Sequence, residues 1–457
     1  MKRTGSVILA AGDGKRMGSA KPKVLCEVLF RPMIGWVADC CNAAGIEQNC
    51  VVLGNGADFV RPFLPFNFEA VLQQERLGTG HAASMARDFI REGDFDHVAV
   101  LCGDAPFITP DLLQEALTLH REQGNGVTVI TARVADPTGY GRIRREGNRL
   151  AAIVEQADAD EETLRIDEIN AGAYWFRKDF LLRFFDAMGN DNAQGEYYLT
   201  DCVQAAARLG ETAGAWLSPT ADVALGANTR KGLALLNSIA RERVLDKLMD
   251  AGVSIPFPDG IVVGDQVEIG PDTVLLPGTI ILGKVTIGSG CEIGPNSHIT
   301  DSVIGDGCRV ISSYIDQSTI EENVKIGPMS NVRPNCHIKS GAKIGDFVEI
   351  KNSVIGSKTA VAHLTYVGDS DVGDRCNFGC GTVTVNYDGA KKYRTTIGNN
   401  VFVGCNTNLI APVTMGDRSY SAAGTTVTQD VPPGALVIGR SRQKVIEGWT
   451  ETSGKTK

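Results

Sequence analysis

The sequence predicts an α/β domain joined by a long helix to a left-handed parallel β-helix of hexapeptide repeats. Three observations lead to this fold class. Apolar strands alternate with helical segments in the first half of the chain, an amphipathic segment follows, and small aliphatic residues then recur every six positions. We place the α/β domain at residues 1–228, the helical linker at 229–252, and the β-helix with a C-terminal arm at 253–457.

Composition and charge narrow the classes of function. The 457 residues exceed what a single core usually supports, and contents of 43% hydrophobic and 22% charged residues are typical of a soluble protein. A net charge of -9 argues against nucleic acid or an anionic membrane as the main partner, which leaves small molecules. Because there is no signal pattern and no apolar stretch of eighteen residues, we expect a cytoplasmic protein whose twelve cysteines are reduced.

The first predicted strand, residues 6–11, runs into a glycine-rich loop at residues 12–18. The loop is not a P-loop, because no Gly-Lys-Ser/Thr closes it, and Met17 replaces the third glycine of a dinucleotide fingerprint. Its backbone N–H groups can face a phosphate, with Arg16 and Lys23 as nearby positive charges. A tight strand-to-helix turn with solvated basic residues is the alternative.

A later apolar strand, residues 98–102, ends in Gly103-Asp104. Open α/β sheets bind ligands at the carboxyl ends of their strands, where a lone carboxylate suits Mg²⁺ bridging phosphates. Asp104 is therefore a candidate metal ligand, with a helix N-cap or turn residue as the alternative.

Several motifs occur in order along the chain, namely Leu9-Ala10-Ala11-Gly12-x-Gly14-x-Arg16-Met17, Pro22-Lys23-Val24-Leu25, Leu77-Gly78-Thr79-Gly80-His81-Ala82, Gly139-Tyr140-Gly141-Arg142, Ile169-Asn170-Ala171-Gly172 and Gln194-Gly195-Glu196-Tyr197-Tyr198. Together they resemble the sugar-nucleotide pyrophosphorylases, and above all the bacterial bifunctional family that makes UDP-N-acetylglucosamine. That family joins an N-acetylglucosamine-1-phosphate uridylyltransferase to a glucosamine-1-phosphate N-acetyltransferase. The resemblance spans essentially the full chain. It implies a Rossmann-like nucleotidyltransferase fold for the first domain, a homotrimer, and a product that feeds peptidoglycan and lipopolysaccharide precursors.

The resemblance also implies residue roles in the first domain. It implies that UTP and the product are bound by Leu9, Ala10, Ala11, Gly12, Arg16, Lys23, Gln73, Gly78 and Thr79. It implies that the sugar is held by Gly141, Glu155 and Asn170, and Mg²⁺ by Asp104 and Asn228. Positive charge suits the reaction, because a sugar phosphate must attack the α-phosphate of UTP and two anions must meet. Two residues depart from the family pattern, since Cys102 replaces an aromatic residue and Lys15 replaces a threonine.

Residues 229–252 have apolar side chains at helical spacing, and Ala251-Gly252 ends the pattern. Charged residues fill the other faces, so we expect an amphipathic helix of about six turns. Its expected role is that of a linker packed along one edge.

The six-residue period is clearest at Ile320, Ile326, Val332, Ile338, Ile344 and Ile350. It suits a strand that turns a corner every six residues and buries one aliphatic side chain each time, which describes a left-handed β-helix of about ten coils. The interval shortens to five at Ile304 and at Ile355. Residues 386–393 break the period more strongly, and because insertions in such repeats form loops, they are a candidate functional loop.

Outward polar residues on this scaffold supply a second candidate site. His363 is the candidate general base, because acetyl transfer from a thioester needs a neutral amine and imidazole titrates near neutrality. A solvated surface histidine is the alternative. The resemblance implies that the sugar phosphate is bound by Arg333, Lys351, Tyr366, Asn377 and Lys392. It implies that acetyl-CoA is bound by Cys380, Asn386, Tyr387, Cys405, Ala423 and Arg440, where the two cysteines replace the usual small residues.

Three rival interpretations remain. The first is a nucleotidyltransferase whose β-helix is only a regulatory or oligomerising cap, as in ADP-glucose pyrophosphorylases, although such caps are short. The second is a hexapeptide metalloenzyme resembling γ-carbonic anhydrases. It needs three histidines converging on zinc, whereas His298, His337 and His363 lack the close spacing. The third is a purely structural solenoid.

Overall fold

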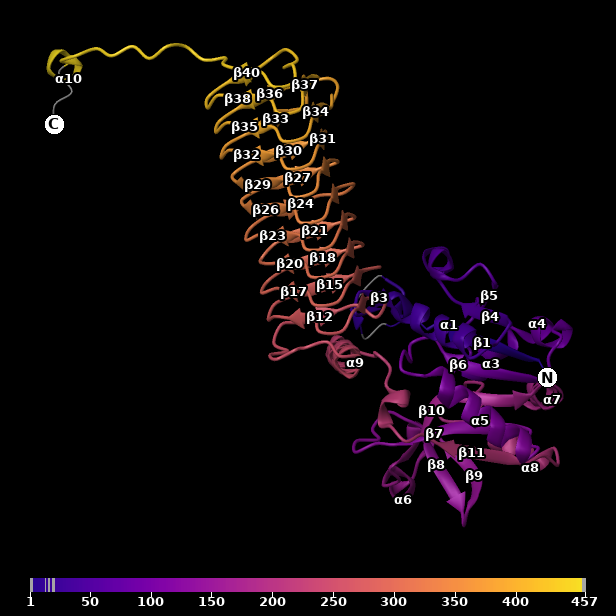
Figure 1. The fold of residues 1–457 in the computed structure, drawn as a ribbon. Helices are drawn as coiled ribbons and strands as arrows, with labels where there is room; N and C mark the ends of the chain where they lie inside the picture. The colour runs from indigo at the N-terminus through magenta and orange to yellow at the C-terminus, as the bar shows by residue number, and fades with distance from the viewer. Residues whose placement is uncertain (1–2, 13, 15–16, 19–20, 454–457) are drawn as a thin grey trace. The chain divides into compact units, whose positions relative to one another are not determined.

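The computed structural model describes residues 3–12, 14, 17–18 and 21–453 (Figure 1). The chain forms two compact units, Met1–Ala240 and Arg241–Lys457. Each unit is described by itself below.

The first unit contains a mixed sheet of nine strands in the order β11-β7-β10-β6-β1-β4-β5, with β8 and β9 attached beside β10. Strands β6, β1, β4 and β5 are mutually parallel, whereas β10 runs antiparallel to both β6 and β7. The strand bounds are β1 (Thr4–Ala10), β4 (Gln48–Leu53), β5 (Phe68–Leu72), β6 (His97–Cys102), β7 (Val127–Arg133), β8 (Arg142–Glu146), β9 (Arg149–Val154), β10 (Glu168–Arg177) and β11 (Ala213–Leu217), with a small pair β2 (Glu27–Val28) and β3 (Arg31–Pro32) outside the sheet. The predicted strands at residues 6–11 and 98–102 are therefore confirmed as β1 and β6.

Helices cover both faces of this sheet, and the helix bounds are α1 (Met33–Ala43), α2 (Ala57–Val60), α3 (Thr79–Ser84), α4 (Arg87–Glu92), α5 (Pro110–Glu122), α6 (Glu161–Leu164), α7 (Lys178–Ala187) and α8 (Cys202–Arg208). Neighbouring residues of β1 point into different cores: Ile8 packs with residues of α1 and α5, whereas Val7 packs with residues of α3, α4, α7 and α8. Burial on both faces explains why the central strands are continuous apolar runs in the sequence. The carboxyl ends of β1 and β6 lie side by side, since Leu9 pairs with Cys102.

Helix α9 (Arg230–Asp250) confirms the predicted helix between the domains. Its first half bonds to the first unit, because the side-chain oxygen of Asn237 accepts from the N–H of Leu29 at 2.9 Å. Its second half belongs to the β-helix: Arg241 donates to the carbonyl of Ile261 at 2.6 Å, and Leu245 lies in the β-helix core. The division between the two units thus falls inside the helix.

The second unit is a left-handed parallel β-helix with three faces. In each face a strand pairs in parallel with the third strand that follows it along the chain, except at the end of the third face, where β38 (Tyr420–Ser421) pairs with β40. The first face runs from β12 (Val262–Val263) to β39 (Thr426–Val427), the second from β13 (Glu268–Ile269) to β37 (Val413–Met415), and the third from β14 (Val274–Leu275) to β40 (Leu436–Val437). The faces hold ten, nine and ten strands, which confirms the expected number of coils.

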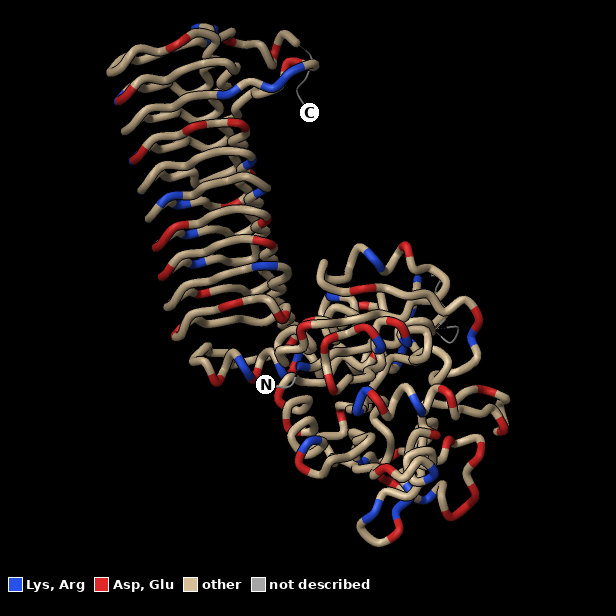
Figure 2. The backbone as a smooth tube through the Cα atoms, turned by 90° about the vertical axis from the view of Figure 1, so that its right-hand side faces the viewer, with Lys and Arg blue, Asp and Glu red and all other residues tan. Residues whose placement is uncertain are grey.

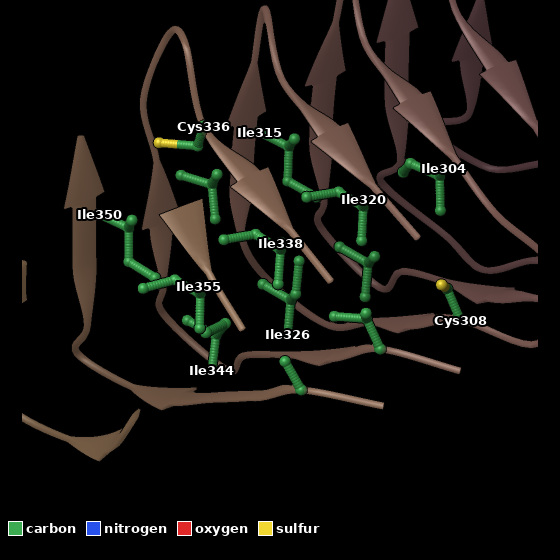
Figure 3. Close-up of a cluster of buried hydrophobic side chains, with 14 of the residues drawn as sticks. Ile304, Cys308, Ile315, Ile320, Ile326, Cys336, Ile338, Ile344, Ile350 and Ile355 are labelled. Atoms are coloured by element: carbon green, nitrogen blue, oxygen red, sulfur yellow. The ribbon is translucent and has the colours of Figure 1, made fainter. Parts of the chain in front are cut away.

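The register of the coils follows the sequence period. Ile281 pairs with Ile299, eighteen residues later, as three hexapeptides require. Where the interval shortens, Ile338 pairs with Ile355 after only seventeen residues, and the ladder continues. The aliphatic side chains stack inside the coils and are almost fully buried (Figure 3).

The break at residues 386–393 is confirmed as a loop. The coil that contains it takes 25 residues, since Asn377 pairs with Phe402, yet the strands on either side keep their register. The loop closes on itself, because Tyr387 bridges Lys392 and the N–H of Tyr393 donates to the carbonyl of Asn386 at 2.9 Å.

All twelve cysteines lie in the described part of the chain and are free thiols, as predicted. No helix among the described residues has the length and apolar character needed to cross a bilayer.

Candidate active sites

A pocket of about 260 Å³ opens at the carboxyl ends of β1 and β6 in the first unit, and it is lined by Leu9, Ala11, Gly12, Gln73, Arg76, Gly78, Thr79, Ala82, Cys102 and Glu196. Six of these residues were predicted to bind the nucleotide. Ala10, also predicted, has its side chain in the core. Arg76, Ala82 and Glu196 were not predicted, although each stands in or beside a motif quoted above. Arg16 and the unusual Lys15 lie outside the described residues.

Gly78 holds the rim of this pocket in a conformation that favours glycine. Its φ is +111°, and a Cβ at this position would lie 2.5 Å from the carbonyl oxygen of Tyr197. The contact exists because Tyr197 pairs with the loop, donating to the carbonyl of Leu77 at 2.7 Å. The buried amide of Gln73 also donates to the carbonyl of Gly78, at 3.3 Å.

We expect Gly78→Ala to displace this rim, because a Cβ in such a backbone region and at such a distance costs on the order of 1–3 kcal/mol. The KM for UTP in uridylyl transfer should rise about tenfold or more, and the unfolding temperature should fall. Gly189→Ala is the matched control, because nothing lies within 4 Å of a Cβ there and its φ is ordinary. Equal kinetics for both variants would contradict the role given to Gly78.

Lys23, Asp104 and Asn228 come together although 124 positions separate the last two. The ammonium group of Lys23 donates to Oδ1 of Asn228 at 2.5 Å and forms an ion pair with the Asp104 carboxylate. Gly14 permits the approach of the lysine, since its φ is +60° and a Cβ there would lie 2.8 Å from Cβ of Lys23. The two predicted metal ligands therefore direct their side-chain oxygens toward the same point, and the Lys23 ammonium group lies at that point.

This pair of oxygens fits Mg²⁺, which takes hard oxygen ligands and usually keeps several from phosphates and water. Within the described residues no group of three or more His, Cys, Asp or Glu side chains is arranged to hold a metal. Among the described residues, Asp104 and Asn228 would supply two ligands, and oxygens of substrate and water would supply others. The same result gives no support to a zinc site of the carbonic anhydrase type.

The three predicted sugar ligands also converge. The N–H of Asn170 donates to the carbonyl of Gly141 at 2.9 Å, and a Cβ on Gly141 would lie 3.4 Å from Oε1 of Glu155. Burial raises the pKa of Glu155, and the hydroxyl of Thr200 donates to its carboxylate at 3.0 Å, which opposes that rise. Cys102 lies at the junction of this group with Asp104, and burial raises the pKa of its thiol to about 12. The thiol is thus a neutral pocket wall.

On the β-helix, His363 ends β29 (Ala360–His363) at the edge between the third and first faces. Nδ1 of His363 lies 3.1 Å from Oδ1 of Asp346, which ends β26 (Lys343–Asp346) one coil below. The imidazole is 58% exposed, so one nitrogen is held while the ring still meets solvent. Asp346 was not predicted.

Four predicted acetyl-CoA residues continue along this same edge, which we call the His363 edge. Backbone bonds stack the corners in order: Gly381 donates to Leu364 at 3.1 Å, Asn406 to Cys380 at 2.7 Å, and Gly424 to Cys405 at 2.7 Å. The Arg440 guanidinium donates to the carbonyl of Ala423 at 2.5 Å. His363, Cys380, Cys405, Ala423 and Arg440 therefore form one line along the β-helix.

Three cations gather at the other edge of the first face, which we call the Lys351 edge. The neighbouring ammonium group of Lys392 lowers the pKa of Lys351, and the charge of Arg333 lowers it further. Arg333 is also paired with Glu349 at 2.8 Å. Both signs of charge are interspersed along the coils (Figure 2). A generally basic surface therefore does not explain this cluster, which is suited to binding an anion.

A buried carboxylate organises the Lys351 edge. Asp369 accepts hydrogen bonds from Asn352 at 2.5 Å and from Asn386. Burial raises the pKa of Asp369, but these bonds and the charges of Lys351 and Lys392 lower it more, and the net shift is downward. Asp369 was not predicted, although it lies only six residues after the candidate base His363.

The remaining predicted residues divide between the edges. Tyr366, in β30 (Tyr366–Gly368), brings its hydroxyl within 3.4 Å of the Asn386 amide, at the Lys351 edge. Tyr387 belongs to the loop that starts there, so Asn386 and Tyr387 do not share the His363 edge with the other predicted acetyl-CoA residues. Asn377, in β32 (Asn377–Phe378), lies on the third face and is exposed, apart from the other predicted sugar-phosphate residues.

A nucleotidyltransferase-like unit followed by a hexapeptide β-helix, each with its own polar site, defines a two-domain transferase. Residues 6–168 match the family described as MobA-like NTP transferase domain, and residues 266–301 and 317–352 match the bacterial transferase hexapeptide. A solved structure described as a putative glucose-1-phosphate thymidylyltransferase from Bacillus anthracis in complex with a sucrose covers 52% of this chain and 96% of that chain, with 20% identity and a TM-score of 0.44.

Relatives named bifunctional protein GlmU match along nearly their whole length. The protein from Caldanaerobacter subterraneus subsp. tengcongensis is 49% identical over 99% of this chain and 98% of its own. Those from Thermoanaerobacter pseudethanolicus and Clostridium acetobutylicum are 48% and 45% identical, over 98% and 99% of this chain and 97% and 99% of their own. The chain belongs to the family of bifunctional GlmU proteins. It is a bifunctional acetyltransferase and uridylyltransferase of UDP-N-acetylglucosamine synthesis, which confirms the resemblance seen in the motifs.

Proposed function

We propose that the two reactions take place at the two sites described above. The β-helix transfers an acetyl group from acetyl-CoA to glucosamine-1-phosphate with His363 as general base. The first unit then transfers uridylyl from UTP to N-acetylglucosamine-1-phosphate in the presence of Mg²⁺, releasing pyrophosphate. The observation that supports this division most strongly is the contact between His363 and Asp346, because a carboxylate behind an exposed imidazole is the arrangement of a positioned base.

In the acetyl transfer, Nδ1–H of His363 donates to Asp346, which leaves Nε2 unprotonated and turned outward. Nε2 takes a proton from the sugar ammonium or from the amine as it attacks the thioester. Arg333, Lys351 and Lys392 hold the sugar phosphate by charge, and Arg440 at the end of the His363 edge faces a phosphate of CoA. These cationic side chains therefore recognise both substrates by the negative charge of their phosphates.

In the uridylyl transfer, the residues of this chain bind and orient two anions. Lys23 neutralises phosphate charge beside Asp104 and Asn228, and the rim at Gly78 and Gln73 holds the base. Glu155 and Asn170 hold the sugar so that its phosphate is in line with the α-phosphate of UTP. Mg²⁺, when bound by Asp104 and Asn228, supplies further neutralisation of the phosphates.

The assembly that we propose is a homotrimer, and the proposed location is the cytoplasm. The His363 edge and the Lys351 edge lie on opposite sides of one face of a single β-helix. Asn377 lies on another face. On one copy, the candidate base is therefore separated from the cations that bind the sugar phosphate. A neighbouring copy can bring its own Lys351 edge next to the His363 edge, which gives a physical reason for the trimer.

The activity is tested by offering the protein glucosamine-1-phosphate, acetyl-CoA and UTP with Mg²⁺. UDP-N-acetylglucosamine, pyrophosphate and free CoA should form in equal amounts. Omitting acetyl-CoA should stop the sequence unless N-acetylglucosamine-1-phosphate is supplied. If only one of the two half-reactions takes place, the two-site proposal is wrong.

Asp346→Asn should weaken the base without removing it, because an amide holds the ring less well and does not stabilise the imidazolium. We expect kcat for acetyl transfer to fall about 10- to 100-fold with little change in KM for either substrate. Glu321→Gln is the matched control, since Glu321 accepts from His337 at 2.8 Å in a similar pair elsewhere on the β-helix. A similar loss in both variants would mean that the carboxylate acts only on folding.

A further inference from the structure

Two buried cysteines meet on consecutive coils of the β-helix. Cys291 and Cys308 directly precede β17 (Glu292–Ile293) and β20 (Arg309–Val310), which pair in parallel and in register. The N–H of Glu292 donates to the carbonyl of Cys308 at 2.9 Å. The cysteines therefore occupy the same position of adjacent coils, where paired strands lie about 4.8 Å apart.

The same position recurs along this edge and is filled by small or medium-sized buried residues, namely Thr273, Cys291, Cys308, Val324, Ala342, Thr359, Cys376, Val401 and Ser419. Within this ladder Cys291 and Cys308 are the two thiols that adjoin. Cys376 has Thr359 below it and Val401 above it. Cys336 lies at a different edge, well apart from Cys308 (Figure 3).

Both thiols lie inside the core and are almost fully buried. The Cys291 thiol donates to the carbonyl of Gly305 at 3.2 Å, and the Cys308 thiol donates to the carbonyl of Glu321 at 2.9 Å. The neighbouring Cys308 thiol lowers the pKa of Cys291 to about 7, and the neighbouring Cys291 together with burial raises the pKa of Cys308. One member of the pair can therefore lose its proton near neutral pH, and the thiolate is the form that attacks a disulfide.

We propose that Cys291 and Cys308 are a modification site. Exchange with a small-molecule disulfide links the two cysteines to each other and so joins two coils of the β-helix covalently. The strand spacing lies within the Cα separation of about 4.4–6.8 Å that a disulfide needs, and the two Cβ atoms must approach to about 3.5–4.5 Å, slightly closer than that spacing. Neither residue belongs to the sites assigned above. The site therefore goes beyond the two transfer reactions.

The reaction is a double thiol–disulfide exchange. The Cys291 thiolate attacks one sulfur of R–S–S–R, forming a mixed disulfide and releasing RS⁻. Cys308 then attacks Sγ of Cys291, and the second RS⁻ leaves and takes up the proton lost by Cys308. Two protein thiols are oxidised and one small disulfide is reduced to two thiols. Because both cysteines are buried, exchange requires brief opening of these coils and should be faster in moderate urea.

The new bond should stabilise the β-helix. It closes a loop of one coil and restricts the unfolded chain, while the folded chain already has the required spacing. The unfolding temperature of the oxidised protein should therefore rise by several degrees.

The test compares the full-length protein after incubation with oxidised glutathione and with dithiothreitol. We expect a peptide containing both cysteines joined and lacking two hydrogens after non-reducing digestion, no retained glutathione, and a higher unfolding temperature that dithiothreitol reverses. Cys376→Ser should keep both results. Cys291→Ser and Cys308→Ser should lose both, with each variant compared with its own reduced form so that a less stable fold still reports.

Three outcomes would overturn the proposal. Both thiols could remain free for alkylation after unfolding of the treated protein. Glutathione could stay attached to either cysteine without the internal link. The link could form with no change in the unfolding temperature, which would remove its stabilising role.

Discussion

Replacing His363 with alanine is expected to lower acetyl transfer by about 10²- to 10⁴-fold, the usual contribution of a positioned general base. Uridylyl transfer should be unchanged, because the residues proposed for it lie in the other compact unit. The loss should appear in kcat, since the imidazole acts on the amine proton and not on the phosphate that anchors the sugar. The measurement is release of CoA from acetyl-CoA with glucosamine-1-phosphate, beside release of pyrophosphate from UTP.

His337→Ala is the control for this variant. His337 is a second β-helix histidine on a carboxylate, at 2.8 Å from Glu321, and it is 43% exposed. It lies on β25 (His337–Ile338) of the second face, away from the His363 edge. Loss of acetyl transfer in both variants, or loss of both activities in His363→Ala, would contradict the assignment of the base.

Replacing Asp104 with alanine is expected to lower uridylyl transfer by about 100-fold or more, with acetyl transfer intact. The carboxylate faces the Lys23 ammonium and the side-chain oxygen of Asn228. Its removal leaves one predicted metal ligand and changes the charge beside the phosphates. The dependence of the rate on Mg²⁺ concentration should also shift to higher values, which is measured by pyrophosphate release across a magnesium series.

Asp111→Ala is a suitable control for the metal assignment, because Asp111 lies nearby in sequence, in the first turn of α5, and is exposed. It should keep the activity and the magnesium dependence of the unaltered protein. A normal magnesium dependence in Asp104→Ala would show that the ion is held elsewhere.

The β-helix could be predicted in detail because its repeat is local. One buried aliphatic residue every six positions sets the strands, the corners and the number of coils, and a five-residue interval such as that at Ile355 changes only the pairing distance. The α/β unit could be predicted less completely. Its apolar runs indicate strands, but the antiparallel position of β10 between β6 and β7 depends on pairing between distant segments.

The residues of the candidate sites likewise divide into those that the sequence could predict and those that it could not. Asp104 and Asn228 meet across 124 positions, and only the family resemblance, not the spacing, paired them. Asp346 was missed although the signal was present. The shortened interval at Ile355 makes a coil of seventeen residues, and this offset places Asp346 directly beside His363. The grouping of Asn386 with Lys351 could not be read from the period, because the loop leaves the repeat at that point.

Helix α9 determines where this protein can be cut. Asn237 bonds to the first unit and Leu245 lies in the core of the second, so neither unit owns the whole helix. A fragment that ends at residue 228 lacks the hydrogen bond that Leu29 makes with Asn237. A fragment that begins at residue 253 exposes the apolar side chains of the β-helix core that Leu245 covers. The helix is therefore part of both units, and separating them into two stable proteins would require each to carry its own copy of residues 230–250.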